Sequence, residues 1–323
     1  MLFLLAGLIA AGCSKNDDRS TDTPYPPIAA DDADITDRFD PLFARALQKR
    51  GYIADADRII YKEIKNITEI SISGTYDERG EVASLQGIEC FTALTDLACS
   101  YNQLTSLDVS GNRALVYLSC DYNELTSLNV SANTVLSSLA CNYNRLATLD
   151  VSKNTALTEL LCCSNELTAL DLSKNTALTV LWCFSNELTA LDVSRNTALT
   201  KLLCNGNRLT TLDVSRNTVL SNFACDSNEL TVLDLSKNTE LTDLTCGTCK
   251  LTSLDISHNT KLGLFECYGN PGDGAVFPVT AWFDNDSVPT GPLPDGSGYN
   301  YYFTSGSWRS GGNTVAVDYR KAK

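Results

Sequence analysis

A period of 21 residues constrains this chain of 323 residues more than any other feature of its sequence. From Leu94 onward, cysteine recurs at that spacing nine times without an insertion. The positions are Cys99, Cys120, Cys141, Cys162, Cys183, Cys204, Cys225, Cys246 and Cys267. Such a period is typical of repeated units that stack into a solenoid, because a single unit cannot bury its own apolar faces.

Each unit combines a short strand with a turn. Residues 157–177 read LTELLCCSNELTALDLSKNTA. Alternation places Leu160 and Cys162 on one face of the strand and Leu161 on the other. The asparagine three residues after each of these cysteines is expected to turn inward, where its amide bonds backbone groups that the bend leaves unpaired. This predicts an asparagine ladder of Asn102, Asn123, Asn144, Asn165, Asn186, Asn207 and Asn228.

The unit closely resembles the leucine-rich repeat, L-x-x-L-x-L-x-x-N/C-x-L, with cysteine at the third apolar position. Its short period is similar to that of internalin-like bacterial proteins. The resemblance covers about residues 85–270. It implies an α/β, β-rich repeat solenoid with 21-residue coils, and it suggests a role in adhesion or host interaction.

The N-terminal flank of the repeat is expected to cover one end of the stack. We assign residues 35–84 to a cap and an irregular first coil. Asp40-Pro41 favours a helix start and Lys49-Arg50-Gly51 a stop. The helix between them carries one apolar stripe, formed by Leu42, Phe43, Ala46 and Leu47. The first coil uses Ile67, Ile70 and Ile72 where later units use leucine, and a longer insertion follows at 74–83.

The C-terminal flank, residues 271–323, has strand-like alternation in place of the period. Apolar residues alternate from Phe277 to Phe283 and again from Val315 to Tyr319. This predicts a β-rich cap that hides the open edge strand of the solenoid, since such an edge invites aggregation.

The N-terminus indicates export. The apolar run at 2–11 is too short to cross a bilayer, which needs about 20 residues, and is typical of a secretion signal. Ala10-Ala11-Gly12-Cys13 resembles the lipobox of bacterial lipoproteins, which implies a signal peptide at 1–12 and acylation of Cys13. The following Ser14 to Asp18 is similar to the signal that sends lipoproteins of Gram-negative gut anaerobes to the outer face of the outer membrane.

Two features depart from the lipoprotein pattern. Ala10 stands where leucine is commoner, and no Lys or Arg precedes the apolar run, which would fit a start codon further upstream. A soluble exported chain is the alternative. Residues 13–34 are polar and contain prolines, so we expect them to form a flexible tether.

Charge and composition exclude several function classes. The formal net charge is -14, so the chain lacks the cationic surface on which nucleic-acid binding depends. The chain has a single histidine, His258, which argues against catalysis by imidazole groups and against metal sites built from histidines. We expect no enzyme active site in the repeats and no cofactor.

The cysteines are expected to be small buried hydrophobic residues. Stacked neighbours lie about 4.8 Å apart, which exceeds the Cβ separation of about 3.8 Å that a disulfide requires. A column also cannot converge on zinc as four ligands must. Cys246-Gly247-Thr248-Cys249 looks like a redox motif, but Cys249 falls on the position that asparagine occupies elsewhere, so we favour a structural role.

Aspartates form a second column at the same period, followed three residues later by a basic column. The acids are Asp108, Asp150, Asp171, Asp192, Asp213, Asp234 and Asp255, interrupted by Asn129. The bases are Lys153, Lys174, Arg195, Arg216, Lys237 and His258. The acids are expected to bond N–H groups of the turns, with the bases offsetting their repulsion. Calcium binding is the alternative, although the chain has no EF-hand loop and no glycine-rich nonapeptide.

The outward residues of the strands are expected to form the binding face of the solenoid. Counting in steps of 21 brings an apolar group together at its middle: Leu161, Cys163, Val180, Trp182, Phe184 and Leu203. A second, aromatic group lies toward the N-terminal end: Tyr101, Tyr117, Tyr122 and Tyr143. An exposed apolar patch with a central tryptophan is typical of a protein-binding hot spot.

Two partners fit these residues. The leading hypothesis is a surface-anchored protein that binds a protein ligand without catalysis. The alternative is a glycan-binding lipoprotein of a nutrient-uptake system, with Tyr101, Tyr122, Tyr143 and Trp182 as platforms for sugar rings. A third reading leaves the aromatics without a ligand, shielding strand backbone or covered by the C-terminal cap or a second copy.

Overall fold

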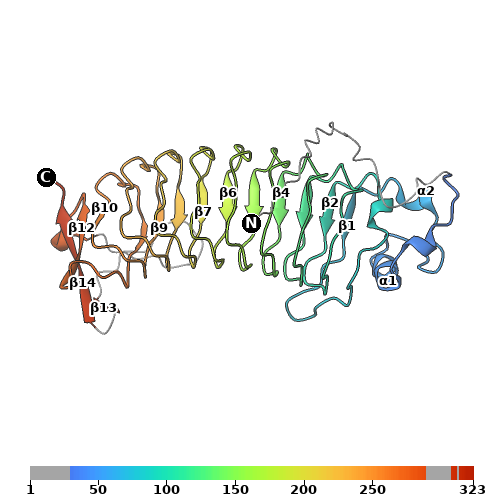
Figure 1. The fold of residues 1–323 in the computed structure, drawn as a ribbon, viewed down its shortest axis with the longest axis horizontal. Coiled ribbons are helices and arrows are strands. Elements are labelled where there is room, and N and C mark those ends of the chain that lie inside the picture. The colour runs from blue at the N-terminus through green and yellow to red at the C-terminus, as the bar shows by residue number, and fades with distance from the viewer. Residues whose placement is uncertain (1–29, 289–306, 311–312) are drawn as a thin grey trace, which may run out of the picture.

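The computed structural model describes residues 30–288, 307–310 and 313–323, and its main feature is a ten-stranded parallel sheet. Nine strands follow one another along the solenoid and β11 completes the sheet beside β9 (Figure 1). The strands are β1 (Glu69–Ser71), β2 (Asp96–Ala98), β3 (Tyr117–Ser119), β4 (Ser138–Ala140), β5 (Glu159–Leu161), β6 (Val180–Trp182), β7 (Lys201–Leu203), β8 (Asn222–Ala224), β9 (Asp243–Thr245) and β11 (Leu264–Glu266).

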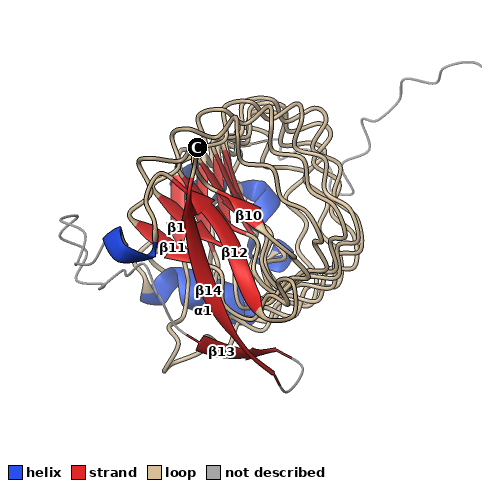
Figure 2. Cartoon of the chain, turned by 90° about the vertical axis from the view of Figure 1, so that its left-hand side faces the viewer, coloured by secondary structure: helices blue, strands red, loops and turns tan. Residues whose placement is uncertain are grey.

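The register of the sheet confirms the period. From β2 to β11, residues 21 apart in the sequence are paired neighbours, as in Leu160 beside Leu181. The interior of each coil holds the leucines and the nine cysteines of the period, which are all buried and unbridged. Figure 2 looks along the coils, with the strands on one side and loops on the other. The predicted repeat solenoid is therefore confirmed.

The asparagine ladder predicted after the strands is also confirmed. The side chain of Asn186 donates from Nδ2 to the carbonyls of Cys162 and Cys183, at 3.0 and 3.1 Å. Its Oδ1 accepts from the N–H of Leu167 in the preceding coil at 3.0 Å. Each amide thus ties two coils together at the bend, where the strand ladder has ended.

A second asparagine ladder, which we did not predict, lies on the loop side. It comprises Asn112, Asn133, Asn154, Asn175, Asn196, Asn217, Asn238 and Asn259, all fully buried. Asn196 donates to the carbonyls of Leu172 and Asn175, at 3.2 and 2.8 Å. Its Oδ1 has no partner within the described part of the chain. The asparagines of this second ladder therefore connect neighbouring coils only through the hydrogen bonds that their side-chain amides donate.

The N-terminal end contains the predicted helix. α1 (Pro41–Lys49) begins at Asp40, whose side chain accepts from the N–H groups of Leu42 and Phe43. Phe43 and Leu47 are buried, but Leu42 is 42% exposed and Ala44 is buried in its place. The stripe predicted through Leu42 is therefore displaced by about one position.

Shorter elements complete this end of the molecule: η1 (Thr36–Arg38), α2 (Tyr61–Ile64) and η2 (Ile88–Cys90). Asp31 and Asp32, which we assigned to the flexible tether, form ion pairs with Lys65 and Lys62 of the α2 region. These two acids therefore belong to the folded part. Cys13 and residues 1–29 lie outside the described residues.

The C-terminal end forms a separate four-stranded sheet in the order β10-β12-β14-β13. Its strands are β10 (Leu254–Asp255), β12 (Val276–Ala281), β13 (Ser307–Ser310) and β14 (Asn313–Lys321), with η3 (Asn285–Ser287) beside them. Phe277, Val279 and Ala281 are fully buried, as their alternation predicted. The sheet joins the solenoid through β10, on the loop side, and does not extend the main sheet beyond β11.

Candidate functional site

The apolar group predicted on the strand face is present, around β5, β6 and β7. Leu161, Val180, Trp182, Phe184 and Leu203 are each half-buried. Trp182 and Phe184 lie with their ring centroids 6.5 Å apart. We call these five residues the Trp182 patch. Trp182 keeps part of its surface accessible, although its indole Nε1 is covered and has no partner in the described residues.

Cys163 does not belong to this patch. Its side chain is 2% exposed, and its Sγ lies 2.8 Å from Oδ1 of Asn142 in the preceding coil. Burial raises the pKa of its thiol to about 12, so the thiol stays protonated at neutral pH. Cys163 therefore contributes to the wall of the coil and offers no contact surface.

The position of Cys163 in the coil reveals how backbone N–H groups are satisfied on the strand face. In the N-terminal coils, the side chain at this position accepts from the N–H of the equivalent residue one coil later. Asp121 Oδ1 accepts from Asn142 N at 2.7 Å, and Asn142 Oδ1 accepts from Cys163 N at 2.9 Å. We call this arrangement the side-chain cap.

The side-chain cap stops at the Trp182 patch. At this position, Phe184 lies one coil after Cys163, and Asn205 lies one coil after Phe184. The side chains of Cys163 and Phe184 contain no oxygen that could accept a hydrogen bond from the next coil. The N–H groups of Phe184 and Asn205 have no acceptor among the described residues. Unpaired main-chain donors are costly away from water. The patch therefore joins apolar surface to two main-chain donors that find no acceptor in the part of the chain that the structure describes.

The tyrosines at the N-terminal end form a stack. Tyr101, Tyr122 and Tyr143 follow three successive strands, and adjacent ring centroids lie 4.2 Å apart with planes inclined by 10°. All three have positive φ, between 52° and 55°, a region that bulky residues rarely adopt. Burial and the hydroxyls of its two neighbours raise the pKa of Tyr122 above its ordinary value.

Stacking limits what these rings can bind. Both faces of Tyr122 are covered, so the ring cannot serve as a platform for a sugar. Tyr143, at the end of the stack, is 43% exposed. Tyr117 is not part of the group, because it begins β3 while the stacked rings follow the ends of their strands. The four tyrosines therefore do not form one surface.

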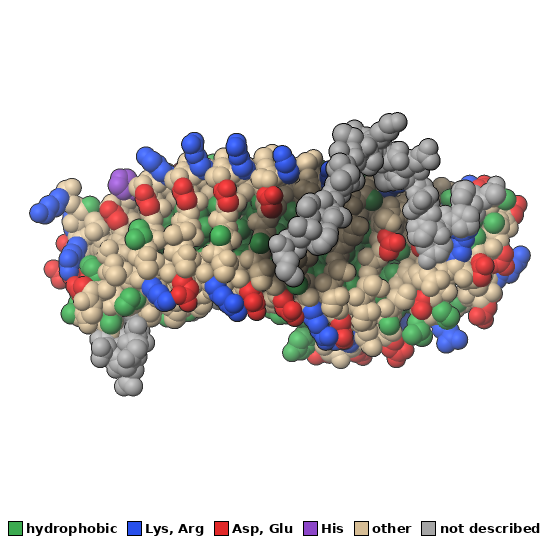
Figure 3. Space-filling view, viewed as in Figure 1, with side chains coloured by type: hydrophobic (Ala, Val, Ile, Leu, Met, Phe, Trp, Pro, Cys, Tyr) green, Lys and Arg blue, Asp and Glu red, His purple; other side chains and the backbone are tan. Residues whose placement is uncertain are grey.

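The aspartate column lies on the loop side and makes the predicted turn contacts. In each turn the aspartate accepts from the N–H of the serine two residues on, as Asp192 does from Ser194 at 2.9 Å. This bonding to Ser194 lowers the pKa of Asp192. Figure 3 shows the carboxylates in a row beneath a row of Lys and Arg that ends at His258. Within the described ranges no group of three or more His, Cys, Asp or Glu side chains is placed to hold a metal.

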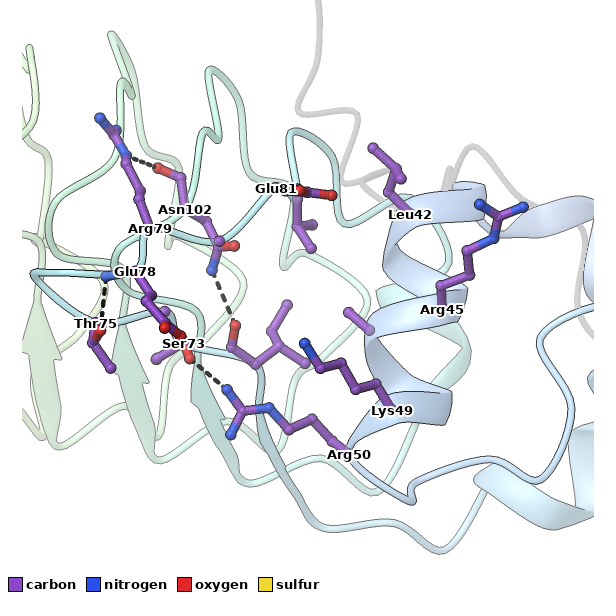
Figure 4. Close-up of a pocket in the computed structure, with 15 residues that line it drawn as sticks. Leu42, Arg45, Lys49, Arg50, Ser73, Thr75, Glu78, Arg79, Glu81 and Asn102 are labelled. Carbon is purple, nitrogen blue, oxygen red and sulfur yellow. Dashed lines mark hydrogen bonds between the residues drawn. The ribbon is translucent and has the colours of Figure 1, made fainter.

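A pocket that sequence analysis missed lies between α1 and the 74–83 insertion, with a volume of about 420 Å³ (Figure 4). The guanidinium of Arg50 donates to the carbonyl of Ser73 across it at 2.7 Å. Gly80 packs so tightly against Asn102 that a Cβ there would lie 2.1 Å from Asn102 Oδ1. No sequence signal marks this pocket, because the insertion leaves the period.

Comparison with solved structures places these features in a known architecture. The functional domain of InlJ from Listeria monocytogenes, which includes a cysteine ladder, is 38% identical, with a TM-score of 0.70, over 76% of this chain and 56% of that one. The fold is a leucine-rich-repeat solenoid. This chain spans little more than half the length of that structure.

Two further structures share the fold at lower identity. A leucine-rich-repeat protein of Leptospira interrogans is 22% identical over 65% of this chain and 62% of that one, with a TM-score of 0.56. Internalin C2 of Listeria monocytogenes is 19% identical over 65% of this chain and 95% of that one, with a TM-score of 0.53. No protein-family model matches the chain, and no curated protein matches it. No helix among the described residues is long and apolar enough to cross a bilayer.

Proposed function

We propose that this chain is a non-catalytic recognition protein that binds a protein ligand on the strand face of its solenoid. The observation that carries the proposal is the Trp182 patch, where half-buried apolar side chains adjoin two main-chain N–H groups that have no acceptor among the described residues. Apolar surface with a tryptophan supplies binding energy, and free N–H groups fix the orientation of a partner through its carbonyl oxygens. A protein chain offers both kinds of group.

Three supporting observations concern the scaffold. Solenoids present an extended strand face for interaction, and this chain shares its architecture with internalin structures. The nine thiols of the cysteine column are buried and have raised pKa values, so none is poised as a nucleophile. His258 lies on the loop side, hydrogen-bonded to Ser257, and the Trp182 patch contains no titratable side chain. These features favour recognition over catalysis.

The experiment is a binding screen followed by a variant pair. Residues 30–323 are tested against arrays of host extracellular proteins and of glycans, and each hit is measured again with Trp182→Ala. We expect a protein hit whose affinity falls by at least about 30-fold, as for a hot-spot tryptophan. Val232→Ala is the matched control, because Val232 is 73% exposed on the loop side. A protein hit unaffected by Trp182→Ala would contradict the proposal, as would hits among glycans alone.

We also propose that Cys13 is acylated and anchors the chain to the outer membrane with the repeats outside, in adhesion or host interaction. The lipobox-like junction and the acidic segment after it support this proposal. Metabolic labelling with a clickable fatty acid tests it. Incorporation is expected in the unaltered chain and absent in Cys13→Ala, whereas equal labelling of both would refute the anchor.

A further inference from the structure

The tyrosine stack ends abruptly at Tyr143, and the next position along it is vacant. The equivalent residue in the following coil is Ser164, which has the same backbone conformation, with φ 53° against 52° for Tyr143. The next two positions are held by Ser185 and Gly206. Because the rings stack along the solenoid axis, the outer face of Tyr143 points toward the space above Ser164.

The stack is maintained against a conformational preference. A positive φ costs glycine little conformational energy but costs a bulky residue more. Bulky residues adopt it only when surrounding contacts compensate. Ser164, Ser185 and Gly206 show that the turn itself does not require a ring. Tyrosines at this position in three successive coils are therefore not needed to form the turn. Stacking of their rings is the contact that compensates for the unfavourable φ.

The two ends of the stack differ. At one end, the 74–83 insertion lies against Tyr101, whose carbonyl accepts from the N–H of Gly80 at 2.7 Å. A cavity of about 240 Å³, lined by Thr75, Tyr76 and Arg79 of the insertion, runs beside all three stacked tyrosines. At the other end, the described residues place no ring on Tyr143, which is 43% exposed while the other two rings are half-buried. The open end faces along the coils that carry the Trp182 patch.

We propose that the outer face of Tyr143 above Ser164 is a subsite for an aromatic side chain of a protein ligand, which enters as the fourth ring of the stack. The 4.2 Å spacing and near-parallel planes leave Tyr143 with a flat outer face at the end of the stack, and a flat ring is the group that stacks on such a face. A phenol also extends the row of hydroxyls. The inference deepens the proposed protein recognition but uses none of the residues of the Trp182 patch.

The test uses a small probe, so it does not depend on the identity of the partner. Binding of N-acetyl-3-fluoro-L-tyrosinamide to the purified full chain is measured by fluorine NMR titration. We expect millimolar binding that N-acetyl-L-leucinamide and methyl glucoside do not compete for. Absence of binding, or equal competition by the aliphatic amide or the sugar, would overturn the subsite.

Two variants sharpen the test. Ser185→Tyr places a ring two positions beyond Tyr143, at twice the stacking distance, so the probe gains a second face and should bind about three- to tenfold more tightly. Thr248→Tyr is the matched control, because Thr248 has φ 48° but lies far from the stack. It should leave the affinity for this subsite unchanged. Equal effects of both variants would show that any added tyrosine suffices.

Removal of the stack completes the test. Tyr101, Tyr122 and Tyr143 are replaced together by Asn, which tolerates positive φ, so that the turns are preserved. Shortening by one ring is insufficient, since it would only expose Tyr122. The triple variant should keep its circular dichroism and lose probe binding. Probe binding that survives in a folded triple variant would refute the proposal, while failure of the probe leaves the Trp182→Ala test of the proposed function independent.

Discussion

Aspartates on the strand face and on the loop side of the same coils behave in opposite ways. Asp121 on the strand face and Asp192 on the loop side both accept a hydrogen bond from a backbone N–H, at 2.7 and 2.9 Å. Burial nevertheless raises the pKa of Asp121, whereas the bonds from Ser194 lower the pKa of exposed Asp192. Desolvation therefore outweighs hydrogen bonding on the strand face, which is the half-covered surface we assign to recognition.

The same comparison applies to the two asparagine ladders, where we predict the largest losses of folding stability. Asn186→Ala on the strand side removes the bonds donated to the carbonyls of Cys162, Cys183 and Phe184 as well as the bond accepted from Leu167, and should cost about 3 kcal/mol. Asn196→Ala on the loop side removes donated bonds only, and should cost about 2 kcal/mol. Urea unfolding followed by circular dichroism measures both. Equal losses would show that the accepted bond contributes little.

The side-chain caps on the strand face predict a smaller effect. Asn142→Ala removes the acceptor of the Cys163 N–H and should lower the free energy of unfolding by about 1 to 2 kcal/mol. Asn205→Ala, at the same position two coils beyond Cys163, is the control, since no N–H group of the described residues donates to the Asn205 side chain, whose residue accepts only through its backbone carbonyl. It should change stability by less than about 0.5 kcal/mol. A comparable loss in both would remove the distinction between capped and free N–H groups.

The pH dependence gives the smallest predicted effect, with opposite signs for the two aspartates. Since the pKa of Asp121 is raised in the folded state, its ionisation destabilises the fold as pH rises through and above 3.8, and Asp121→Asn should gain stability relative to the unaltered chain from pH 3 to pH 7.

For Asp192 the sign reverses. Its lowered folded pKa stabilises the fold above pH 3.8, and this contribution is lost as pH falls through the folded value. Asp192→Asn should therefore lose stability relative to the unaltered chain over the same rise in pH. Urea midpoints at pH 3 and pH 7 for the two variants measure both. Parallel trends would contradict the assignment of burial and hydrogen bonding as the two causes.

The interior of the fold could be predicted from the sequence because it repeats. Each interior position is sampled nine times, so the roles of Cys162, Leu160 and Asn165 follow from geometry shared by all coils. The loop-side ladder was equally visible, as asparagine recurs in steps of 21 from Asn112 to Asn259. We made no prediction for it, because we considered only the charged columns of that turn, whereas the amide of its asparagine is fully buried.

The candidate site was less predictable, because it depends on what differs between coils. Position alone placed Cys163 outward with Trp182, but its bond to Asn142 holds it against the wall. Position alone also grouped Tyr117 with the stacked rings, although it lies at the other end of its strand. The stacking itself requires the positive φ of three turns, which the period does not reveal.

The constant coil length also bears on how such a molecule changes over generations. Because units from residue 94 to 270 keep one length, in-frame duplication or loss of a unit would rejoin matching surfaces. A newly copied unit would keep the interior residues that pack against its neighbours, while substitutions at its few outward positions would not disturb that packing. The Trp182 patch and the tyrosine stack lie in different units, so replacement of the units that carry one of them would leave the side chains of the other in place.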